Sequence, residues 1–184
     1  MTTTAPPPSP SLRLTQIAEQ ARQLYEELGP EGLTMRSLAA RLGIRAPSLY
    51  KHVSGKDELE VLLIVEALRG MGESLHAALA SVPARSPRRP ALTALAAAYR
   101  SWALAHPHLY RLATGGELPR EQLPEGLEAW TAAPLVGVAG SEHRARAAWA
   151  FAHGMTILEL DGRFPAGADL DAAWAKGVAA FRHG

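Results

Sequence analysis

Two short apolar stretches flank Gly43, and their spacing constrains the fold more than any other feature of the chain. Thr34 can cap a first helix over residues 35–42, and Gly43 permits the positive φ of a tight turn. A second helix over residues 47–53 begins with proline, which suits the first helical position, and small Ala39 lets the two helices cross closely. The pattern predicts a helix-turn-helix. The apolar contacts that would fix its crossing angle come from Leu38, Leu42, Ile44, Leu49 and Val53.

Apolar residues recur every three or four positions on both sides of this motif. A first helix over residues 14–28 ends at Gly29-Pro30. A long helix begins with Ser54-Gly-Lys-Asp57, where the aspartate takes the place of the usual Glu or Gln of a capping box. That helix reaches about Val82, and a basic, proline-rich hinge follows over residues 83–90. Further helices are expected over residues 91–105, 108–113, 125–138, 141–160 and 169–182.

The composition favours an all-α fold of about nine helices. Ala and Leu are abundant, whereas β-branched and aromatic residues are scarce. We expect residues 1–10 to form a disordered tail, residues 11–56 a three-helix head and residues 57–184 a helical body. The tail lacks the apolar core of a signal peptide, and the absence of cysteine suits a reducing compartment, so we expect a cytoplasmic protein.

The second helix of the motif carries cations and hydrogen-bond donors on its outward side. An α-helix is about as wide as the major groove of DNA, and base edges there are read by such side chains. Arg45, Ser48 and Lys51 have side chains that could reach base edges. Tyr50 and His52 are better suited to phosphate oxygens. The motif therefore predicts a DNA-reading helix.

Neighbouring residues point to further phosphate contacts. The Thr34 hydroxyl suits a phosphate, and Ala46 offers no side-chain oxygen to cap a helix that starts at Pro47, which leaves backbone N–H groups free. Lys56 lies in the first turn of the next helix, where the macrodipole disfavours a cation, and a nearby phosphate would explain it. Up to Lys56 the chain has seven basic and four acidic side chains. The predicted DNA-binding set is Thr34, Arg36, Arg45, Ala46, Pro47, Ser48, Tyr50, Lys51, His52 and Lys56.

Each of these features also has a purely structural explanation. A helix-turn-helix pattern can be a packing corner, Tyr50 can lean on the head, and Lys56 can be an ordinary solvated lysine. The occurrence of the motif together with the segment from Tyr50 to Leu59 favours DNA binding.

Residues 33–43 and 46–59 closely resemble the tetracycline-repressor (TetR) family of regulators. The matching stretches read Leu-Thr-Met-Arg-Ser-Leu-Ala-Ala-Arg-Leu-Gly and Ala-Pro-Ser-Leu-Tyr-Lys-His-Val-Ser-Gly-Lys-Asp-Glu-Leu. The strong resemblance covers about residues 11–60. It implies a three-helix DNA-binding head, joined by a long fourth helix to an all-helical body for ligand binding and dimerisation.

The same resemblance implies that Tyr50 and Lys56 bind phosphate. Val53 stands where phenylalanine is commoner in the family, and Arg45 where a small capping residue is common. The positions implied to face the bases are Arg45, Pro47, Ser48 and Lys51. In the C-terminal half, Trp149, His153-Gly154 and Leu158-Glu-Leu160 look like the subgroup whose bodies carry a Trp-His-Gly (WHG) signature.

The body is expected to enclose a small, largely apolar effector. Aromatic residues in helical proteins more often pack in the core than line a pocket. A histidine placed like His153 is more often a hydrogen-bonded core residue than a ligand contact. The candidate effector-binding residues are Trp102, His106, Tyr110, Trp130, His153 and Met155.

The last two predicted helices carry apolar residues on more than one face. Packing this pair against a symmetry mate would give a four-helix interface, with Gly154 and Gly177 allowing close approach. The alternative is a monomer in which both apolar faces are buried in the chain's own core. The candidate dimer-interface residues are Trp149, Phe151, Leu158, Trp174, Val178 and Phe181.

Taken together, the sequence predicts a ligand-responsive repressor that binds a palindromic operator as a homodimer, with no enzymatic activity, cofactor, metal or membrane partner. His106-Pro-His108 is interpreted as a turn, because no recognised metal-ligand spacing accompanies it. Two other classes stay open. One is a helical enzyme that uses His153, Glu159 or Asp161 as acid or base, and the other is an interaction adaptor that does not bind DNA.

Overall fold

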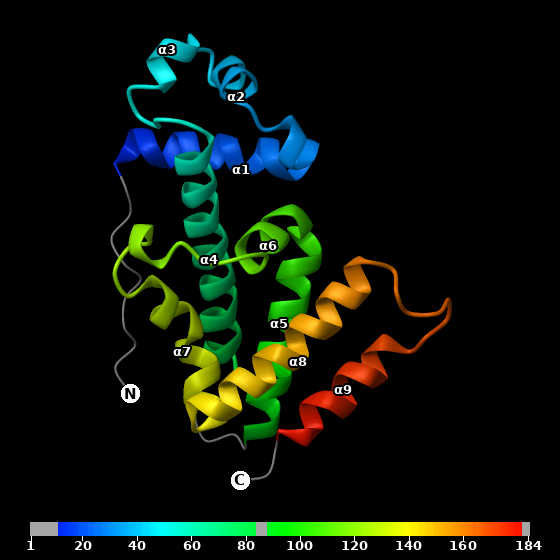
Figure 1. The fold of residues 1–184 in the computed structure, drawn as a ribbon. Helices are drawn as coiled ribbons and strands as arrows, with labels where there is room; N and C mark the ends of the chain where they lie inside the picture. The colour runs from blue at the N-terminus through cyan, green and yellow to red at the C-terminus, as the bar shows by residue number, and fades with distance from the viewer. Residues whose placement is uncertain (1–10, 84–87, 182–184) are drawn as a thin grey trace. The chain divides into compact units, whose positions relative to one another are not determined.

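The computed structural model of the chain describes residues 11–83 and 88–181. Over these residues the chain forms nine α-helices and one short 3-10 helix, without a strand (Figure 1). The predicted all-α class is therefore confirmed. The expected tail, residues 1–10, and residues 84–87 of the expected hinge lie outside the described residues.

The described residues fall into two compact units. The part of the chain up to Arg69 and His106–Glu128 form the first, while Gly70–Ala105 and the part from Ala129 onward form the second. Helix α4 (Lys56–Ala80) belongs to both. The division predicted from sequence, residues 11–56 against residues 57–184, stays a prediction.

Helix α1 (Leu12–Gly32) begins at the N-cap Ser11, whose side chain accepts from the backbone of Leu14. The predicted break at Gly29 is present, because its φ of 70° interrupts the helical backbone, and Pro30 then starts a last turn. One face of α1 is buried inside the first unit. The buried residues of that face are Ile17, Ala18, Ala21, Leu24 and Tyr25.

The remaining elements of the first unit are α2 (Met35–Arg41), α3 (Ala46–Leu49), α6 (Pro107–Thr114) and the 3-10 helix η1 (Arg120–Gln122). Both α2 and α6 pack against α1, and α3 packs against α2. The short η1 was not predicted, since three residues are too few to show an apolar period.

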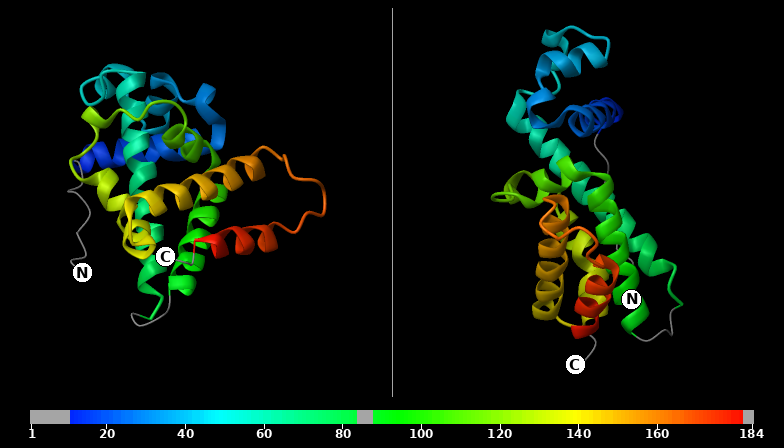
Figure 2. Two further views of the ribbon diagram at one scale, coloured as in Figure 1. Left: turned by 60° about the horizontal axis from the view of Figure 1, so that its bottom comes forward. Right: turned by 90° about the vertical axis from the view of Figure 1, so that its right-hand side faces the viewer.

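The second unit contains α5 (Arg88–Ala105), α8 (Glu142–Leu160), α9 (Leu170–Ala180) and most of α7 (Leu127–Ala139). Helices α8 and α9 run antiparallel beside each other in both views of Figure 2, and α5 packs against both of them. A polar side chain caps the N-terminus of α8 and of α9: Ser141 accepts from the Arg144 amide in α8, and Asp169 accepts from the Ala172 amide in α9. Within the described part of the chain, every helix is either too short or too polar to span a bilayer.

Candidate nucleic-acid interface

A capping box and a left-handed glycine shape the corner between α2 and α3. The Thr34 hydroxyl accepts from the Ser37 amide at 3.0 Å, and the Ser37 hydroxyl accepts from the Thr34 amide at 2.9 Å. Gly43 has φ of 66°, and the Ile44 amide donates back to the Ala39 carbonyl at 3.0 Å. A short helix, a tight turn and a second short helix therefore form as the spacing predicts.

Helix α3 differs in its limits from the predicted helix over residues 47–53. It starts at Ala46 with Arg45 as the N-cap, so the expectation that Ala46 precedes the helix is wrong. The helix ends at Leu49 and turns continue through His52, with a last i→i−4 hydrogen bond from the Val53 amide to the Leu49 carbonyl. The N-cap is Arg45, and its side chain makes no capping bond.

Buried side chains hold α3 and the following turn from behind. Leu49 and Val53 are both completely buried, as is Leu38 of α2, and Ala39 is 3% exposed. Because these residues fill the inner side, the polar residues between them face outward. The anchoring predicted for Leu49 and Val53 is present in the structure.

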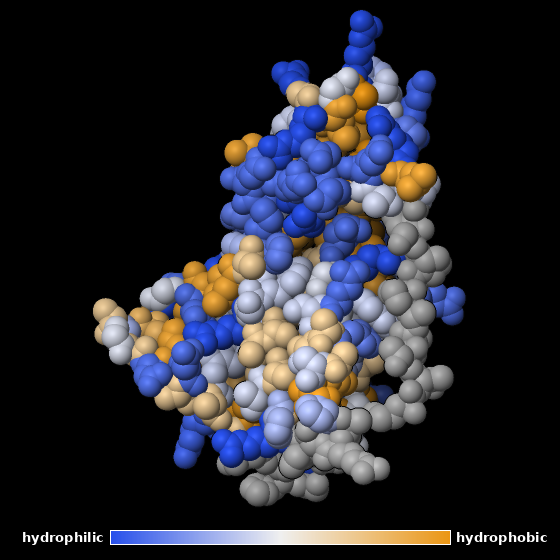
Figure 3. Space-filling model, turned by 180° about the vertical axis from the view of Figure 1, so that it is seen from behind, coloured by the Kyte–Doolittle hydropathy of each residue, from blue (hydrophilic) through white to orange (hydrophobic). Residues whose placement is uncertain are grey.

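The ten residues predicted to bind DNA lie on α2 and α3, at the N-caps of these two helices, and from Tyr50 to the first residue of α4. Nine of them are exposed, and Ala46 is half-buried. Hydrophilic side chains project from the part of the surface that α2 and α3 form (Figure 3). The Tyr50 ring does not lean on the head, since its residue is 52% exposed. The Thr34 hydroxyl already serves the capping box, so only part of its hydrogen-bonding capacity remains.

Lys56 lies at the first position of α4 and is exposed there. Its Nζ is 3.8 Å from an oxygen of Glu60, and the side chains of Lys56 and Glu60 are 52% and 38% exposed. The predicted capping box is partly wrong: Glu58, not Asp57, reaches back and accepts from the Ser54 amide at 2.6 Å. This backbone hydrogen bond lowers the pKa of Glu58. Asp57 and Glu58 also complement the helix N-terminus, which makes a cation beside them easier to accommodate.

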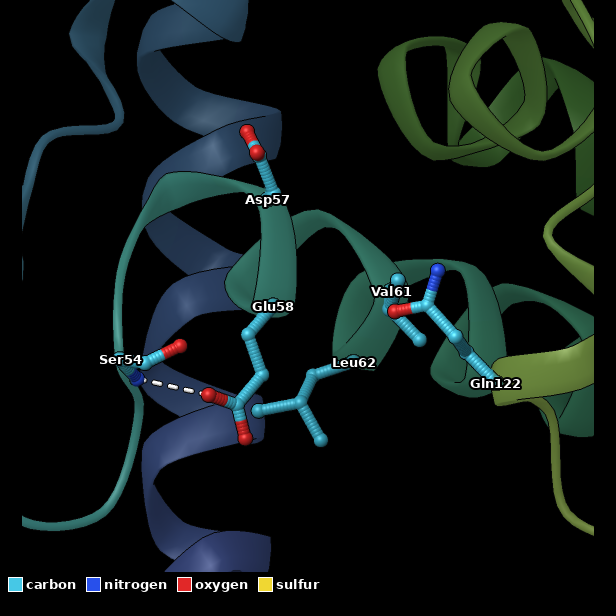
Figure 4. A pocket seen from close by; sticks show the side chains of 6 residues that line it. All are labelled: Ser54, Asp57, Glu58, Val61, Leu62 and Gln122. Carbon is cyan, nitrogen blue, oxygen red and sulfur yellow. Dashed lines mark hydrogen bonds between the residues drawn. The ribbon is translucent and has the colours of Figure 1, made fainter.

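A shallow hollow of about 430 Å³ lies beside this start of α4 (Figure 4). Its rim is polar or acidic, and two aliphatic residues of α4 form its apolar part. The lining residues are Ser54, Asp57, Glu58, Val61, Leu62 and Gln122. None of the predicted effector-binding residues belongs to this set.

An ion pair that the sequence did not indicate fixes α2 to α1. Arg41 donates to both carboxylate oxygens of Glu27, at 3.0 and 2.5 Å. These hydrogen bonds lower the pKa of Glu27. The two residues are fourteen positions apart, so no helical spacing connects them. Arg41 therefore links α2 of the helix-turn-helix to α1.

The six predicted effector-binding residues are spread over both units. Trp102 and Trp130 pack against α4 at positions two residues apart, because a Cβ at Gly70 would lie 3.0 Å from Trp102 and one at Gly72 would lie 2.3 Å from Trp130. Tyr110 is buried in the first unit. The others are half-buried: His106, His153 and Met155.

His153 stands beside the exposed ring of Trp149, with ring centroids 5.8 Å apart. Burial lowers the pKa of His153. Glu159, one of the two carboxylates considered as a catalytic acid or base, accepts hydrogen bonds from the Arg100 guanidinium at 2.7 and 2.9 Å. Among the residues that the structure describes, no three His, Asp or Glu side chains come together as metal ligands would.

The six predicted dimer-interface residues divide into inward and outward groups. Trp174 and Val178 of α9 are buried within a single chain. Phe151 packs between α8 and α9, with its ring 5.6 Å from that of Trp174 and 6.0 Å from that of Phe181. Trp149 and Leu158 remain 47% and 42% exposed. These two are the members available to a partner.

Two polar clusters were not foreseen from the sequence. Glu26 of α1 accepts from the backbone amides of His108 and Leu109 in α6. Arg100 of α5 contacts Glu159 of α8 and Asp171 of α9. Each joins residues more than fifty positions apart, and no sequence pattern marks such pairs.

Comparisons with known proteins agree with this geometry. Residues 17–60 match the family profile described as bacterial regulatory proteins, tetR family, and residues 92–181 match the profile of the tetracyclin repressor-like C-terminal domain. The chain is 30% identical over 158 residues to the HTH-type transcriptional regulator Rv0681 of Mycobacterium tuberculosis, covering 79% of this chain and 69% of that protein. It is 31% identical over 122 residues to the HTH-type transcriptional regulator Mb1846 of Mycobacterium bovis, covering 66% of this chain. The match spans 52% of Mb1846, about half of its length.

Solved structures share the fold. SCO4313, described as a regulatory protein, superposes with a TM-score of 0.72 at 28% identity, over 94% of this chain and 98% of that one. A single-substitution variant of TetR from Acinetobacter baumannii AYE, solved in complex with minocycline, superposes with a TM-score of 0.65 at 23% identity, over 91% and 92% of the two chains. The proposed Trp-His-Gly subgroup is not tested by these matches and stays a prediction.

Proposed function

Since the chain belongs to the tetR family of bacterial regulatory proteins, we propose that it is a transcriptional repressor that binds a palindromic operator as a homodimer and is released by a small, largely apolar effector. Residues 11–56 would form the DNA-binding domain and residues 57–184 the effector-binding and dimerisation domain. The protein would act as a regulator and not as an enzyme.

The observation that carries this proposal is the outward surface of α3 and its flanking turns. Arg45, Ser48 and Lys51 are exposed while Leu49 and Val53 are fully buried behind them. An exposed helix that presents cations and hydroxyls from a fixed position has the properties needed to read the major groove. Tyr50 and Lys56 flank this surface, where phosphate oxygens would lie.

Dimerisation through α8 and α9 is supported by exposed apolar side chains of α8. Trp149 and Leu158 are large and exposed, and Ile157 is half-buried. A helix that is apolar on all sides is normally buried on all sides. A second copy of the chain, packed by a two-fold axis, would cover these residues. Two recognition helices would then enter successive major grooves about 34 Å apart.

An effector in the body is supported by the minocycline complex of the structurally similar TetR variant. In our proposal, the bound effector changes the separation of the two α3 helices and so lowers the affinity for operator DNA. Because coupling between two sites is reciprocal, operator DNA lowers the affinity for the effector by the same factor. Trp102, Trp130 and Met155 are the residues we would substitute first when an effector is found.

Selection of bound duplexes from random DNA by the full chain tests the proposed function. We expect enrichment of an inverted repeat whose affinity falls steeply with salt. A chain that enriches no duplex at low ionic strength would refute the DNA-binding proposal and favour the adaptor. Gel filtration with light scattering would test the dimer in the same preparation.

A further inference from the structure

One arginine of α5 bonds to both α8 and α9. The Arg100 guanidinium donates to the two carboxylate oxygens of Glu159 in α8, at 2.7 and 2.9 Å. It also donates to Asp171 in the first turn of α9, at 2.5 Å, and lies 5.7 Å from the centre of the Trp174 ring. The side chains of Arg100 and Glu159 are 22% and 14% exposed, so water and salt screen their pairing only weakly. All four residues belong to the second unit.

Helix α9 depends on this contact because the chain that precedes it gives little support. The connection over residues 161–169 projects beyond the ends of α8 and α9 (Figure 1), and nearly all of its residues are exposed. At the other end of α9, Arg144 of α8 donates to the Phe181 carbonyl at 2.8 Å. The start of α9 is therefore placed by the Arg100 contact and its end by Arg144.

The outward faces of α8 and α9 differ in side-chain size. Trp149 and Leu158 of α8 are 47% and 42% exposed. Apart from Asp171 and Lys176, the exposed residues of α9 are alanines: Ala172, Ala173, Ala175 and Ala180. In a two-fold interface each copy presents the same patch, so bulky side chains on one part of the patch need a flat surface on another. The fit between copies then depends on where α9 lies beside α8 within each chain.

We infer that Arg100 is a positioning residue for dimerisation: it sets the placement of α9 beside α8 and so makes their outward faces fit those of a second copy. This inference rests on the proposed function, because it assigns a role within the proposed homodimer. A face that is already ordered loses less conformational freedom on association, so the contact raises the affinity of the dimer. Both copies carry the arginine, and any loss of order is therefore counted twice.

The dissociation constant of the dimer, measured on the intact protein by analytical ultracentrifugation, tests the inference. Arg100→Gln removes the cation and should raise the dissociation constant about ten-fold, which corresponds to the ordering of about one side chain in each subunit. Arg100→Lys keeps the charge but loses the paired donors of the guanidinium, and it should give an intermediate value.

A double variant separates positioning from fold stability. Arg100→Gln leaves Glu159 buried without its cation, and an uncompensated charge destabilises a fold by itself. Arg100→Met/Glu159→Met replaces the ion pair by adaptable apolar side chains, a change that commonly preserves stability. Because this variant lacks the cation that Asp171 bonds, its dissociation constant should still rise about ten-fold. Its helix content by circular dichroism should remain that of the wild-type protein.

Arg41→Gln is the matched control, since Arg41 also donates to both oxygens of a carboxylate on another helix, Glu27 of α1, but lies in the first unit. It should leave the dissociation constant unchanged. An equal rise for Arg41→Gln, or a wild-type dissociation constant in the double variant, would overturn the inference. A wild-type chain that stays monomeric would refute the proposed homodimer itself, which is distinct from a dimer that the Arg100 variants form as tightly as the wild-type chain.

Discussion

Replacement of Lys56 by glutamine separates a phosphate contact from an ordinary surface lysine. In the protein alone, the Lys56 side chain is 52% exposed and lies 3.8 Å from a Glu60 oxygen. Exposed pairs of this kind contribute about 0 to 1 kcal/mol to stability. Lys56→Gln should therefore leave the unfolding midpoint almost unchanged, and any large effect must appear in DNA binding.

The expected effect on DNA binding follows from counterion release. Each phosphate neutralised contributes about 0.9 to the slope of log affinity against log salt, and a dimer carries two copies of Lys56, so the slope should fall by about 1.8. Between about 50 and 200 mM salt, a four-fold change, the wild-type protein should lose about 12-fold more affinity than the variant, since 4 to the power 1.8 is about 12.

Fluorescence anisotropy with a selected duplex, at four salt concentrations, measures these slopes. Lys176→Gln is the matched control, because Lys176 is an exposed lysine of α9, outside the predicted DNA-binding surface. Its slope should equal that of the wild-type protein. Parallel slopes for wild type and Lys56→Gln would show that Lys56 meets no phosphate, and the reasoning from its place at the start of α4 would be wrong.

Three further predictions concern base reading, packing and pH. Arg45→Ala and Lys51→Ala should each relax the preferred sequence at particular base pairs, whereas Tyr50→Phe should weaken all sequences alike; unchanged preferences after repeated selection would reject this division. Gly177→Ala would place a Cβ 1.9 Å from the Phe151 ring, and this overpacking, at about 2 kcal/mol, exceeds the helix-propensity gain of about 1 kcal/mol, so urea unfolding should show a net loss of about 1 kcal/mol; a gain in stability would contradict the packing of α8 on α9. Burial lowers the pKa of His153 below its ordinary value near 6.5, so the stability linked to its neutral form should be present above about pH 6.5 and lost as pH falls through the lowered pKa. His153→Gln should flatten this part of the plot of unfolding temperature against pH. A plot that His153→Gln leaves unaltered would show that His153 does not cause the pH dependence.

Local chemistry made part of the fold predictable. Thr34, Ser141 and Asp169 all cap helices at the starts that the sequence indicates, because a cap depends on residues only three positions away. Gly43 turns the chain where an L side chain would be strained. The outward and inward residues of the α3 segment separate correctly for the same reason, since helical periodicity is itself local.

The exact register of one helix start and the contacts between distant segments were beyond this kind of prediction. Glu58 rather than Asp57 caps the start of α4, a choice that depends on where the first helical residue falls. The partners of Glu26 lie more than eighty positions along the chain. For Trp174 an apolar stripe predicts burial but not what buries it, and in the structure α5 and Phe151 cover it within one chain.

Amide hydrogen exchange of the full chain, with and without a selected duplex, tests most directly whether the surface around α3 lies against DNA. The account predicts slower exchange over residues 45–56 in the complex, together with little change in α9. Unchanged exchange over residues 45–56, with protection elsewhere on the chain, would contradict it.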